Sequence, residues 1–207
     1  FDFTPAETGE SDKTDCLSNQ AFLLAIFGNE QRDIRPLVVS FVGNPSKIQK
    51  KAWYGQPWMS DAKMALNLPS NANNYFSLAV FRPDEAGNYR RKKTQFHALH
   101  AVMLDDVGSK VAMERLTLPP SWLLETSSGN HQAGYLLHEP ITDGTVADKL
   151  MNAIVHAGLC DPGANGPCAR LARLPLAENG KYEPSFQCRM VTWNPERIYT
   201  VQELVDG

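Results

Sequence analysis

Two adjacent carboxylates, Asp105 and Asp106, follow the apolar run Phe96–Leu104 and precede Gly108. Carboxylates at the end of such a run are suited to hold a hard cation such as Mg²⁺, which prefers oxygen ligands and keeps several waters. An acidic pair before Gly is also typical of a solvated turn. The spacing therefore indicates a candidate metal site without excluding a simple loop.

Two further segments carry groups that bind anions. The segment Glu125–His131 reads ETSSGNH, and the backbone N–H groups of such a turn, with its hydroxyls and His131, can bind phosphate oxygens. An ordinary hairpin turn has the same composition.

Arg170 and Arg173 follow Asp161, and guanidinium groups suit both phosphate and carboxylate. Residues three apart on a strand face opposite sides, so a shared pocket requires a bulge or a bend.

Basic residues mixed with aromatic ones form the last candidate region. Its members are Lys47, Lys50, Lys51, Trp53, Tyr54 and Trp58, with an unbroken basic run at Arg90, Arg91, Lys92 and Lys93. This mixture suits single-stranded nucleic acid, through neutralised phosphates and stacked bases. A solvated charged loop explains the basic run equally well. The net charge of −3, from 20 Lys+Arg and 23 Asp+Glu, requires any binding groove to be local.

Short strands separated by turns must position these groups. Strands are expected at Pro36–Val42, Tyr75–Phe81, Phe96–Leu104, Arg170–Leu174 and Gln187–Trp193, and a hairpin at Trp122–Glu125 and Gly134–Leu137. Helices are expected at Ser18–Phe27, which Gly28 stops, and at Val146–Ala157, with Thr145 as N-cap and Asp148 completing a capping box. The pattern predicts an α+β domain around a mixed or mostly antiparallel sheet.

The composition fits one large globular domain. The chain has 207 residues, of which 43% are hydrophobic and 21% charged, and no apolar stretch long enough to span a membrane. We expect a polar, loosely ordered segment at 1–15 and a folded domain at 16–207. Because the chain starts at Phe1 and Thr200 opens a capping box close to its end, the domain reads as excised from a longer protein.

The cysteines favour an intracellular protein. Four Cys without a CxxC pair are too few for a disulfide scaffold. His156, Cys160, Cys168 and Cys188 could in principle bind zinc, but their spacing matches no common zinc motif. Buried or free thiols, and a soluble cytoplasmic protein, are the preferred interpretation.

Taken together, the segments resemble the primase–polymerase domains of the archaeo-eukaryotic primase superfamily, with the RepB-like primases of phages, plasmids and integrated elements as the closest branch. The resemblance runs in order from about Tyr75 to the C-terminus. It is carried by YFSL at 75–78, YRRKK at 89–93, VMLDDVG at 102–108, LLETS at 123–127, GNHQAGY at 129–135, RLARLP at 170–175 and NGK at 179–181.

The resemblance implies a DNA primase or polymerase, a template-directed nucleotidyl transferase that replicates a mobile element by a two-metal mechanism. It implies an RNA-recognition-like unit beside a second α/β unit, with the active site between them. Asp105, Asp106 and Asp161 would hold Mg²⁺ or Mn²⁺, and Ser127, His131, Arg170 and Arg173 would bind a nucleoside triphosphate. The expected partners are a single-stranded DNA template, bound by Lys50, Lys51 and Arg90–Lys93, and a C-terminal helicase domain in the same chain.

One position departs from the pattern of the family. The first motif is usually Asp-hydrophobic-Asp, but Met103 stands two residues before Asp105, and the second carboxylate is its neighbour Asp106. Adjacent residues of a regular strand face opposite sides. Either the backbone turns at this point, or only one of the pair binds metal.

Three alternatives remain open at the level of sequence. The first is a degenerate primase domain that binds DNA or nucleotide without polymerising. The second is an interaction module without catalysis. The third alternative is a rolling-circle initiator, which needs two His on one strand face with one residue between them. His97 and His100 are three apart and do not fit that pattern.

Overall fold

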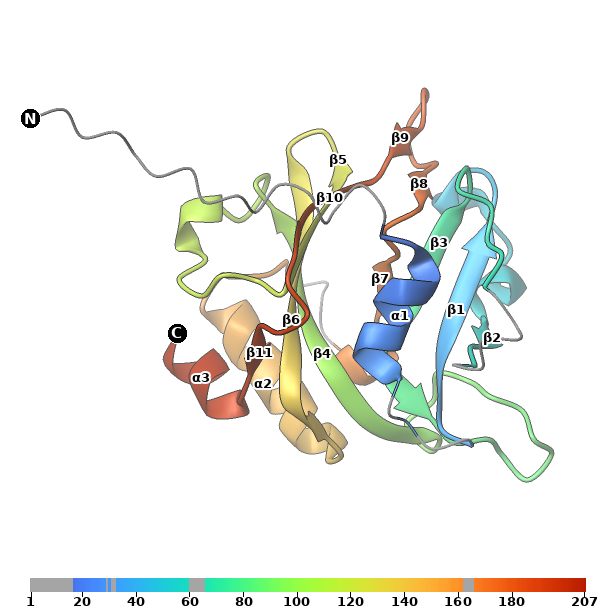
Figure 1. Ribbon diagram of the computed structural model, residues 1–207, viewed down its shortest axis with the longest axis horizontal. Coiled ribbons are helices and arrows are strands. Elements are labelled where there is room, and N and C mark those ends of the chain that lie inside the picture. Colours follow the sequence, from blue (N-terminus) through green and yellow to red (C-terminus); the bar gives the residue numbers. More distant parts are fainter. Residues whose placement is uncertain (1–16, 29, 31–32, 60–65, 162–165) are drawn as a thin grey trace, which may run out of the picture.

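A curved, mostly antiparallel β-sheet dominates the computed structural model, which describes residues 17–28, 30, 33–59, 66–161 and 166–207 (Figure 1). The strand order is β10-β5-β6-β4-β3-β1-β2. In addition, β11 pairs parallel with β6, β7 pairs antiparallel with β3, and β8 and β9 form a separate ribbon. The predicted α+β class with a mixed sheet is confirmed.

The elements follow one another along the chain with these bounds. The strands are β1 Arg35–Phe41, β2 Gln56–Pro57, β3 Asn73–Phe81, β4 Phe96–Val107, β5 Trp122–Ser127, β6 Asn130–Ile141, β7 Leu171–Arg173, β8 Glu178–Asn179, β9 Phe186–Gln187, β10 Arg189–Trp193 and β11 Ile198–Tyr199. The α-helices are α1 Asn19–Phe27, α2 Gly144–His156 and α3 Val201–Asp206, and the short 3-10 helices are η1 Pro45–Lys47, η2 Lys50–Trp53, η3 Met113–Arg115 and η5 Pro167–Ala169. The expected polar segment 1–15 lies outside the described residues.

Local capping chemistry explains where the helices begin. The Ser18 hydroxyl accepts from Ala21 N at the start of α1, and Thr200 and Glu203 form the predicted capping box of α3. The predicted N-cap of α2 is wrong by two residues. Asp143, not Thr145, caps this helix, and its carboxylate accepts from Thr145 N. An earlier acceptor therefore satisfies one of the orphan N–H groups of the first turn.

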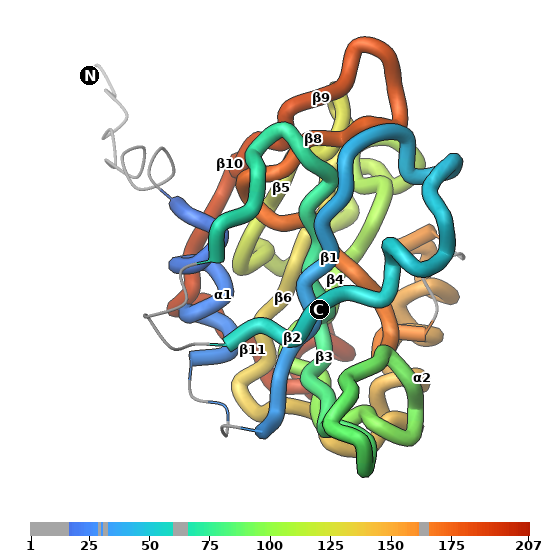
Figure 2. The backbone as a smooth tube through the Cα atoms, turned by 90° about the vertical axis from the view of Figure 1, so that its right-hand side faces the viewer, coloured from blue at the N-terminus to red at the C-terminus, as the bar shows by residue number. Residues whose placement is uncertain are grey.

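Two helices cover opposite faces of the sheet (Figure 2). On one face, Phe22 of α1 packs edge-to-face on Phe76 and Trp122, with ring centroids 5.3 Å and 5.6 Å apart. On the other face, Leu150 and Met151 of α2 are buried. Edge-to-face aromatic packing adds to the burial of apolar area, so this cluster fixes α1 on its face of the sheet. None of the described helices is long and apolar enough to cross a membrane.

Position 134 must be glycine because the Trp122 ring fills the space that a larger side chain would need. The two residues are cross-strand partners in β5 and β6, and a Cβ added at Gly134 would stand 2.0 Å from the indole. We expect Gly134→Ala to lower the free energy of unfolding by about 2 kcal/mol, as overpacking of a buried site does. Urea denaturation measures this effect. Gly144→Ala is the matched control, because its Cβ would meet the Cys168 sulfur at an ordinary 3.5 Å, and an unchanged midpoint for Gly134→Ala would contradict the prediction.

Candidate active site

The site lies beyond a fork in the sheet, where β3 and β4 are no longer paired. The two strands pair only over Ala79–Phe81 and Phe96–Leu99. Beyond the fork, β3 pairs with β7 and β4 pairs with β6. Gln132 of β6 bridges the two branches, because its side-chain oxygen accepts from Arg173 N at 2.9 Å. Strands from distant parts of the chain therefore bring their polar residues together at this place.

A β-bulge at Asp105 and Asp106 breaks the alternation of β4. Leu104 pairs with Ala133 and Val107 pairs with His131. Two residues of β4, Asp105 and Asp106, therefore lie opposite a single residue of β6, Gln132. Asp106 has a left-handed backbone, with φ 61°, a conformation that Asp tolerates better than most residues. The predicted end of the strand at Leu104 is wrong, since β4 continues through the acidic pair to Val107. The backbone does turn there, one of the two possibilities that the sequence left open.

Asp105 is held by neighbours from three segments. Its carboxylate contacts Arg170 Nη2 at 3.1 Å and Gln132 Nε2 at 3.4 Å. Its backbone N–H donates to the buried Cys160 sulfur at 3.3 Å, and Cys160 directly precedes Asp161. Burial raises the pKa of the Cys160 thiol, which keeps it neutral in this role. The bulge and the Asp161 segment are therefore joined through one side chain.

Lys110, which the sequence analysis did not single out, links the other two carboxylates. Its Nζ lies 2.7 Å from Asp106 Oδ2 and 2.9 Å from Asp161 Oδ1, and hydrogen bonds to these two groups raise its pKa above the ordinary value. The sequence signal for this contact is spacing. Lys110 follows Asp106 by four residues, and Gly108 between them allows a tight turn that brings the lysine back to the aspartate. No group of three or more His, Cys, Asp or Glu residues within the described ranges is arranged to hold a metal ion.

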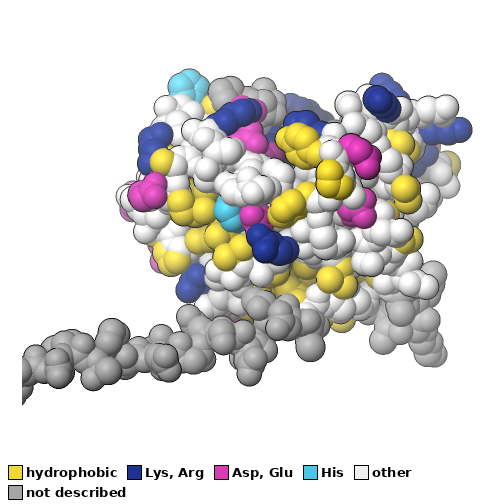
Figure 3. Space-filling model, turned by 90° about the horizontal axis from the view of Figure 1, so that it is seen from above, with side chains coloured by type: hydrophobic (Ala, Val, Ile, Leu, Met, Phe, Trp, Pro, Cys, Tyr) yellow, Lys and Arg dark blue, Asp and Glu magenta, His cyan; other side chains and the backbone are white. Residues whose placement is uncertain are grey.

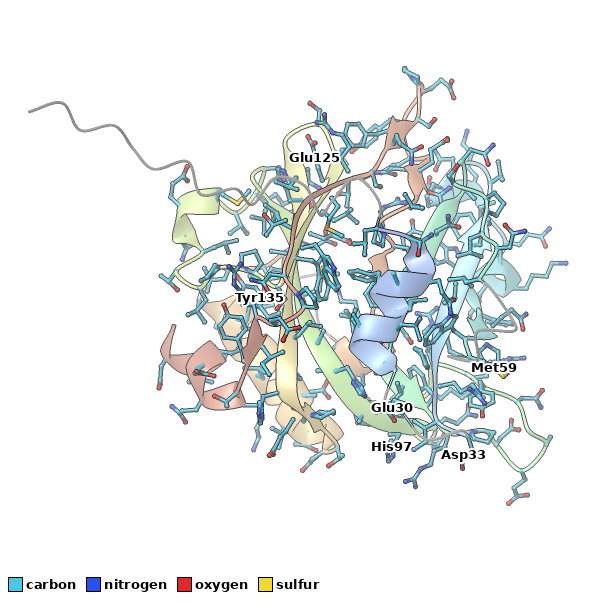
Figure 4. All side chains as sticks on the ribbon, viewed as in Figure 1. Glu30, Asp33, Met59, His97, Glu125 and Tyr135 are labelled. Atoms are coloured by element: carbon cyan, nitrogen blue, oxygen red, sulfur yellow. The ribbon has the colours of Figure 1, made fainter. Side chains whose placement is uncertain are left out.

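The hairpin of β5 and β6 stands beside the bulge. Glu125 lies at the upper end of β5, where Gly129 N donates to it and Arg189 pairs with it (Figure 4). Burial raises the pKa of Glu125, but the Gly129 N–H, Arg189 and His131 together lower it below the usual value. The turn therefore keeps a buried carboxylate ionised beside His131, its cross-strand partner.

His131 contacts the bulge directly. Its Nδ1 lies 3.2 Å from Val107 O, and because a carbonyl oxygen only accepts, Nδ1 carries the proton. Ser127 is the last residue of β5 and pairs with Asn130 across the turn. Gly108, with φ 89°, allows the close approach, since a Cβ there would meet Gly129 O at 2.5 Å. The predicted phosphate-binding turn and the acidic pair are thus neighbours.

Arg170 and Arg173 have different surroundings. Arg170 reaches Asp105, whereas Arg173 is 6% exposed and points into the protein. The Arg173 guanidinium donates to Asn73 Oδ1, Glu178 O and Asn179 Oδ1, at 3.3, 3.0 and 2.8 Å, and stacks 4.6 Å from the centre of the Tyr75 ring. Its burial leaves little of this guanidinium for the predicted contact with a phosphate.

The basic and aromatic region adjoins the fork through packed aromatic rings. Trp53, at the end of η2, lies 5.3 Å from Tyr75, the ring on which Arg173 stacks. Lys50 and Lys51 of the same short helix are exposed. Seen from above, Lys and Arg side chains lie at the right-hand end of the molecule and also at its centre and left (Figure 3).

The basic run Arg90–Lys93 is not a uniform charged loop. Arg91 donates to Trp53 O at 2.6 Å and to Ala169 O at 2.7 Å, so it links η2 to η5. Burial lowers the pKa of the Arg91 guanidinium. Arg90 lies 5.2 Å over the Tyr54 ring, and Lys93 pairs with Asp148 at 3.4 Å. Lys92 is exposed. Arg91 therefore has a structural role in addition to its charge.

Comparison with known proteins relates this geometry to solved structures. No protein-family model and no curated protein sequence matches the chain. Among solved structures, the AEP domain of the cyanophage S-2L primase-polymerase matches with a TM-score of 0.60 at 15% identity, over 91% of this chain and 95% of that one. The chain has the primase–polymerase fold.

Two structures of the primase RepB′ support the same assignment. Its catalytic domain in complex with initiator DNA matches with a TM-score of 0.58 at 16% identity, over 91% of this chain and 92% of that chain. The longer RepB′ structure matches with a TM-score of 0.56 at 15% identity, and the match spans 61% of its length. The resemblance predicted from the sequence is confirmed for the fold.

The histidines of the rolling-circle alternative lie away from the acidic residues. His97 and Glu30 lie at the end of the sheet opposite Glu125 (Figure 4), and His100 Nε2 pairs with Glu30 at 2.8 Å. Cys160, Cys168 and Cys188 are free and buried. Cys160 contacts Asp105 N, but no group of three His, Cys, Asp or Glu side chains among the described residues is arranged to hold zinc.

Proposed function

We propose that this chain is a DNA primase–polymerase that transfers nucleotides under the direction of a template. The observation that supports this most strongly is that Asp106 and Asp161 both contact Lys110 in a primase–polymerase fold, while Asp105 contacts Cys160, the residue before Asp161. The reaction would join a 3′-hydroxyl to the α-phosphate of a nucleoside triphosphate and release pyrophosphate. Replication of a mobile element, with a helicase in the same chain, is the setting we propose.

The acidic residues fit Mg²⁺ or Mn²⁺. Their donors are all carboxylate oxygens, and the Lys110 ammonium already stands as a cation between Asp106 and Asp161. Mg²⁺ is usually bound by one or two carboxylates together with substrate phosphates, so a cage of three protein ligands is not required. We assign the ions to Asp106 and Asp161, with Asp105 as a further ligand. Bound divalent ions would stabilise negative charge on the attacking and leaving oxygens.

The hairpin and one arginine would bind the triphosphate. Ser127 and His131 flank the hairpin turn, His131 contacts Val107 O at the bulge, and Arg170 contacts Asp105. Charge-assisted hydrogen bonds from such groups are short and strong, which suits a polyanion. Arg173 would act indirectly, by holding Tyr75, Asn73 and Asn179 in place under the site.

The basic and aromatic region would bind the single-stranded DNA template. Lys50, Lys51 and Lys92 would neutralise backbone phosphates, and Tyr54, capped by Arg90, is 44% exposed and available for base stacking. Arg91 would hold the two basic loops at a fixed separation through Trp53 O and Ala169 O. Trp53 packs against the buried Tyr75 ring and so connects these loops to the interior beside Arg173.

Extension of a labelled primer on single-stranded DNA tests the proposal. We expect the wild-type chain to add nucleotides only when template, nucleoside triphosphate and Mg²⁺ or Mn²⁺ are all present, and EDTA to stop the reaction. His131→Ala should reduce incorporation about tenfold or more, because it removes a charge-assisted contact to the triphosphate. His138→Ala, an exposed His on β6, is the control. Incorporation that EDTA leaves unchanged would contradict the metal-dependent mechanism.

A degenerate primase domain is the second candidate. Both oxygens of Asp105 already have protein partners, Arg170 and Gln132, and Met103 stands where the family pattern has an acidic residue. Such a domain would bind a labelled nucleoside triphosphate through His131 and add nothing to the primer. The same primer-extension assay, with a parallel binding measurement, separates the two candidates.

A further inference from the structure

Lys110 takes the place of a cation between two carboxylates from distant parts of the chain. Its Nζ contacts Asp106 Oδ2 and Asp161 Oδ1, at 2.7 Å and 2.9 Å, while 63% of its side chain remains exposed. These are the carboxylates to which the proposed function assigns a divalent ion. One ammonium group therefore offsets one of their two negative charges in the ion-free protein.

The loop after β4 determines the position of Lys110. Lys110 N donates to Asp106 O at 3.0 Å, and Gly108 N donates to Val111 O at 2.7 Å, so the chain folds back on the end of the strand. The Ser109 hydroxyl lies within hydrogen-bond distance of two acceptors, Asp106 O and Asn130 Oδ1 in the hairpin turn, and donates its single proton to one of them at a time. The residue before Lys110 thus touches the hairpin that we assign to the triphosphate, and Lys110 itself touches the acidic residues.

We propose that Lys110 is a nucleotide-binding residue that exchanges partners: it holds Asp106 and Asp161 in the ion-free protein and moves to the triphosphate once these carboxylates bind a divalent ion. The inference rests on the proposed function, because that function assigns the ion and the nucleotide to this place. Little free energy is needed to break the contacts of Lys110 with the two carboxylates. An exposed ion pair is weak, and the ammonium sits on a flexible four-carbon stem with three donors.

The exchange predicts two effects of opposite sign. Without Lys110, a divalent ion no longer competes with the ammonium for Asp106 and Asp161, so binding of the ion alone becomes tighter. The triphosphate, however, loses a positively charged partner, so nucleotide binding becomes weaker. A lysine that only supported the loop would, when removed, loosen the site and weaken both.

Binding measurements on Lys110→Met test the proposal without using polymerase activity. We expect Mn²⁺ alone, followed by electron paramagnetic resonance, to bind about threefold tighter or more, and labelled ATP or dATP with Mg²⁺ to bind about fivefold weaker. Lys110→Gln serves as a second substitution. Lys110→Arg keeps the charge and should stay near wild type, and Lys149→Met, an exposed position on α2, is the control.

Each outcome decides the matter. Opposite shifts in the Met and Gln variants support the exchange. If both affinities fall together, or neither changes while the wild-type chain binds ion and nucleotide, Lys110 has no such role although the proposed function stands. If the wild-type chain binds neither Mn²⁺ nor nucleotide and extends no primer, the exchange and the proposed function fail together.

Discussion

Asp105→Asn should lower the rate of primer extension at least about 100-fold while the domain stays folded. The substitution keeps the shape of the side chain and an oxygen that can accept from Gln132, but it removes the negative charge offered to a divalent ion. It also removes the ion pair with Arg170. Because both partners are partly exposed, the loss of that pair should cost no more than about 1 kcal/mol. Steady-state extension assays and the urea unfolding midpoint give the two quantities.

A matched control separates loss of chemistry from loss of a surface charge. Asp206→Asn removes one carboxylate from α3, where Asp206 is exposed and accepts from Gln202, and should leave extension unchanged. Full activity of Asp105→Asn would remove Asp105 from the metal site and leave Asp106 and Asp161 as the ligands. Unfolding of Asp105→Asn would instead show that its contact with Arg170 is structural.

Arg173→Ala should destabilise the domain by about 3 kcal/mol. The substitution removes three hydrogen bonds donated by a buried guanidinium and its stacking on Tyr75, and it leaves a cavity beneath the fork. The buried acceptors Glu178 O, Asn73 Oδ1 and Asn179 Oδ1 would each lose a donor. Asn73 and Asn179 still accept from Gly180 N and Lys181 N, which limits the cost. Urea or thermal unfolding followed by circular dichroism measures it.

The conservative variant distinguishes support from contact with substrate. Arg173→Lys keeps a cation but has fewer donors than the planar guanidinium, so it should lose about half as much stability and remain folded. If Arg173 only positions Tyr75 and Asn179, this variant should keep its affinity for nucleoside triphosphate. A large loss of nucleotide affinity in a stably folded Arg173→Lys would show that Arg173 contacts the phosphates, as the sequence first suggested.

Local signals in the sequence determined most of the framework. Ser18 and Gly28 bound α1, Thr200 and Glu203 cap α3, and the turn at Ser127–Asn130 joins a hairpin, all as predicted. These features depend on neighbours within a few residues, where side-chain chemistry and backbone preference act together. The order of the motifs also indicated the primase–polymerase fold that the comparisons confirm.

The tertiary structure alone decided how the charged groups of the site are paired. A bulge opposite Ala133 and His131 turns the backbone at Asp106, which alternation along a regular strand could not predict. Arg173 is buried against β8 while Arg170 reaches Asp105, and Lys110 joins Asp106 to Asp161 although 51 residues separate lysine from Asp161. The partner of a charge depends on which strands the sheet brings together. Spacing along the chain specifies the chemical groups available, and only long-range strand pairing specifies which of them meet.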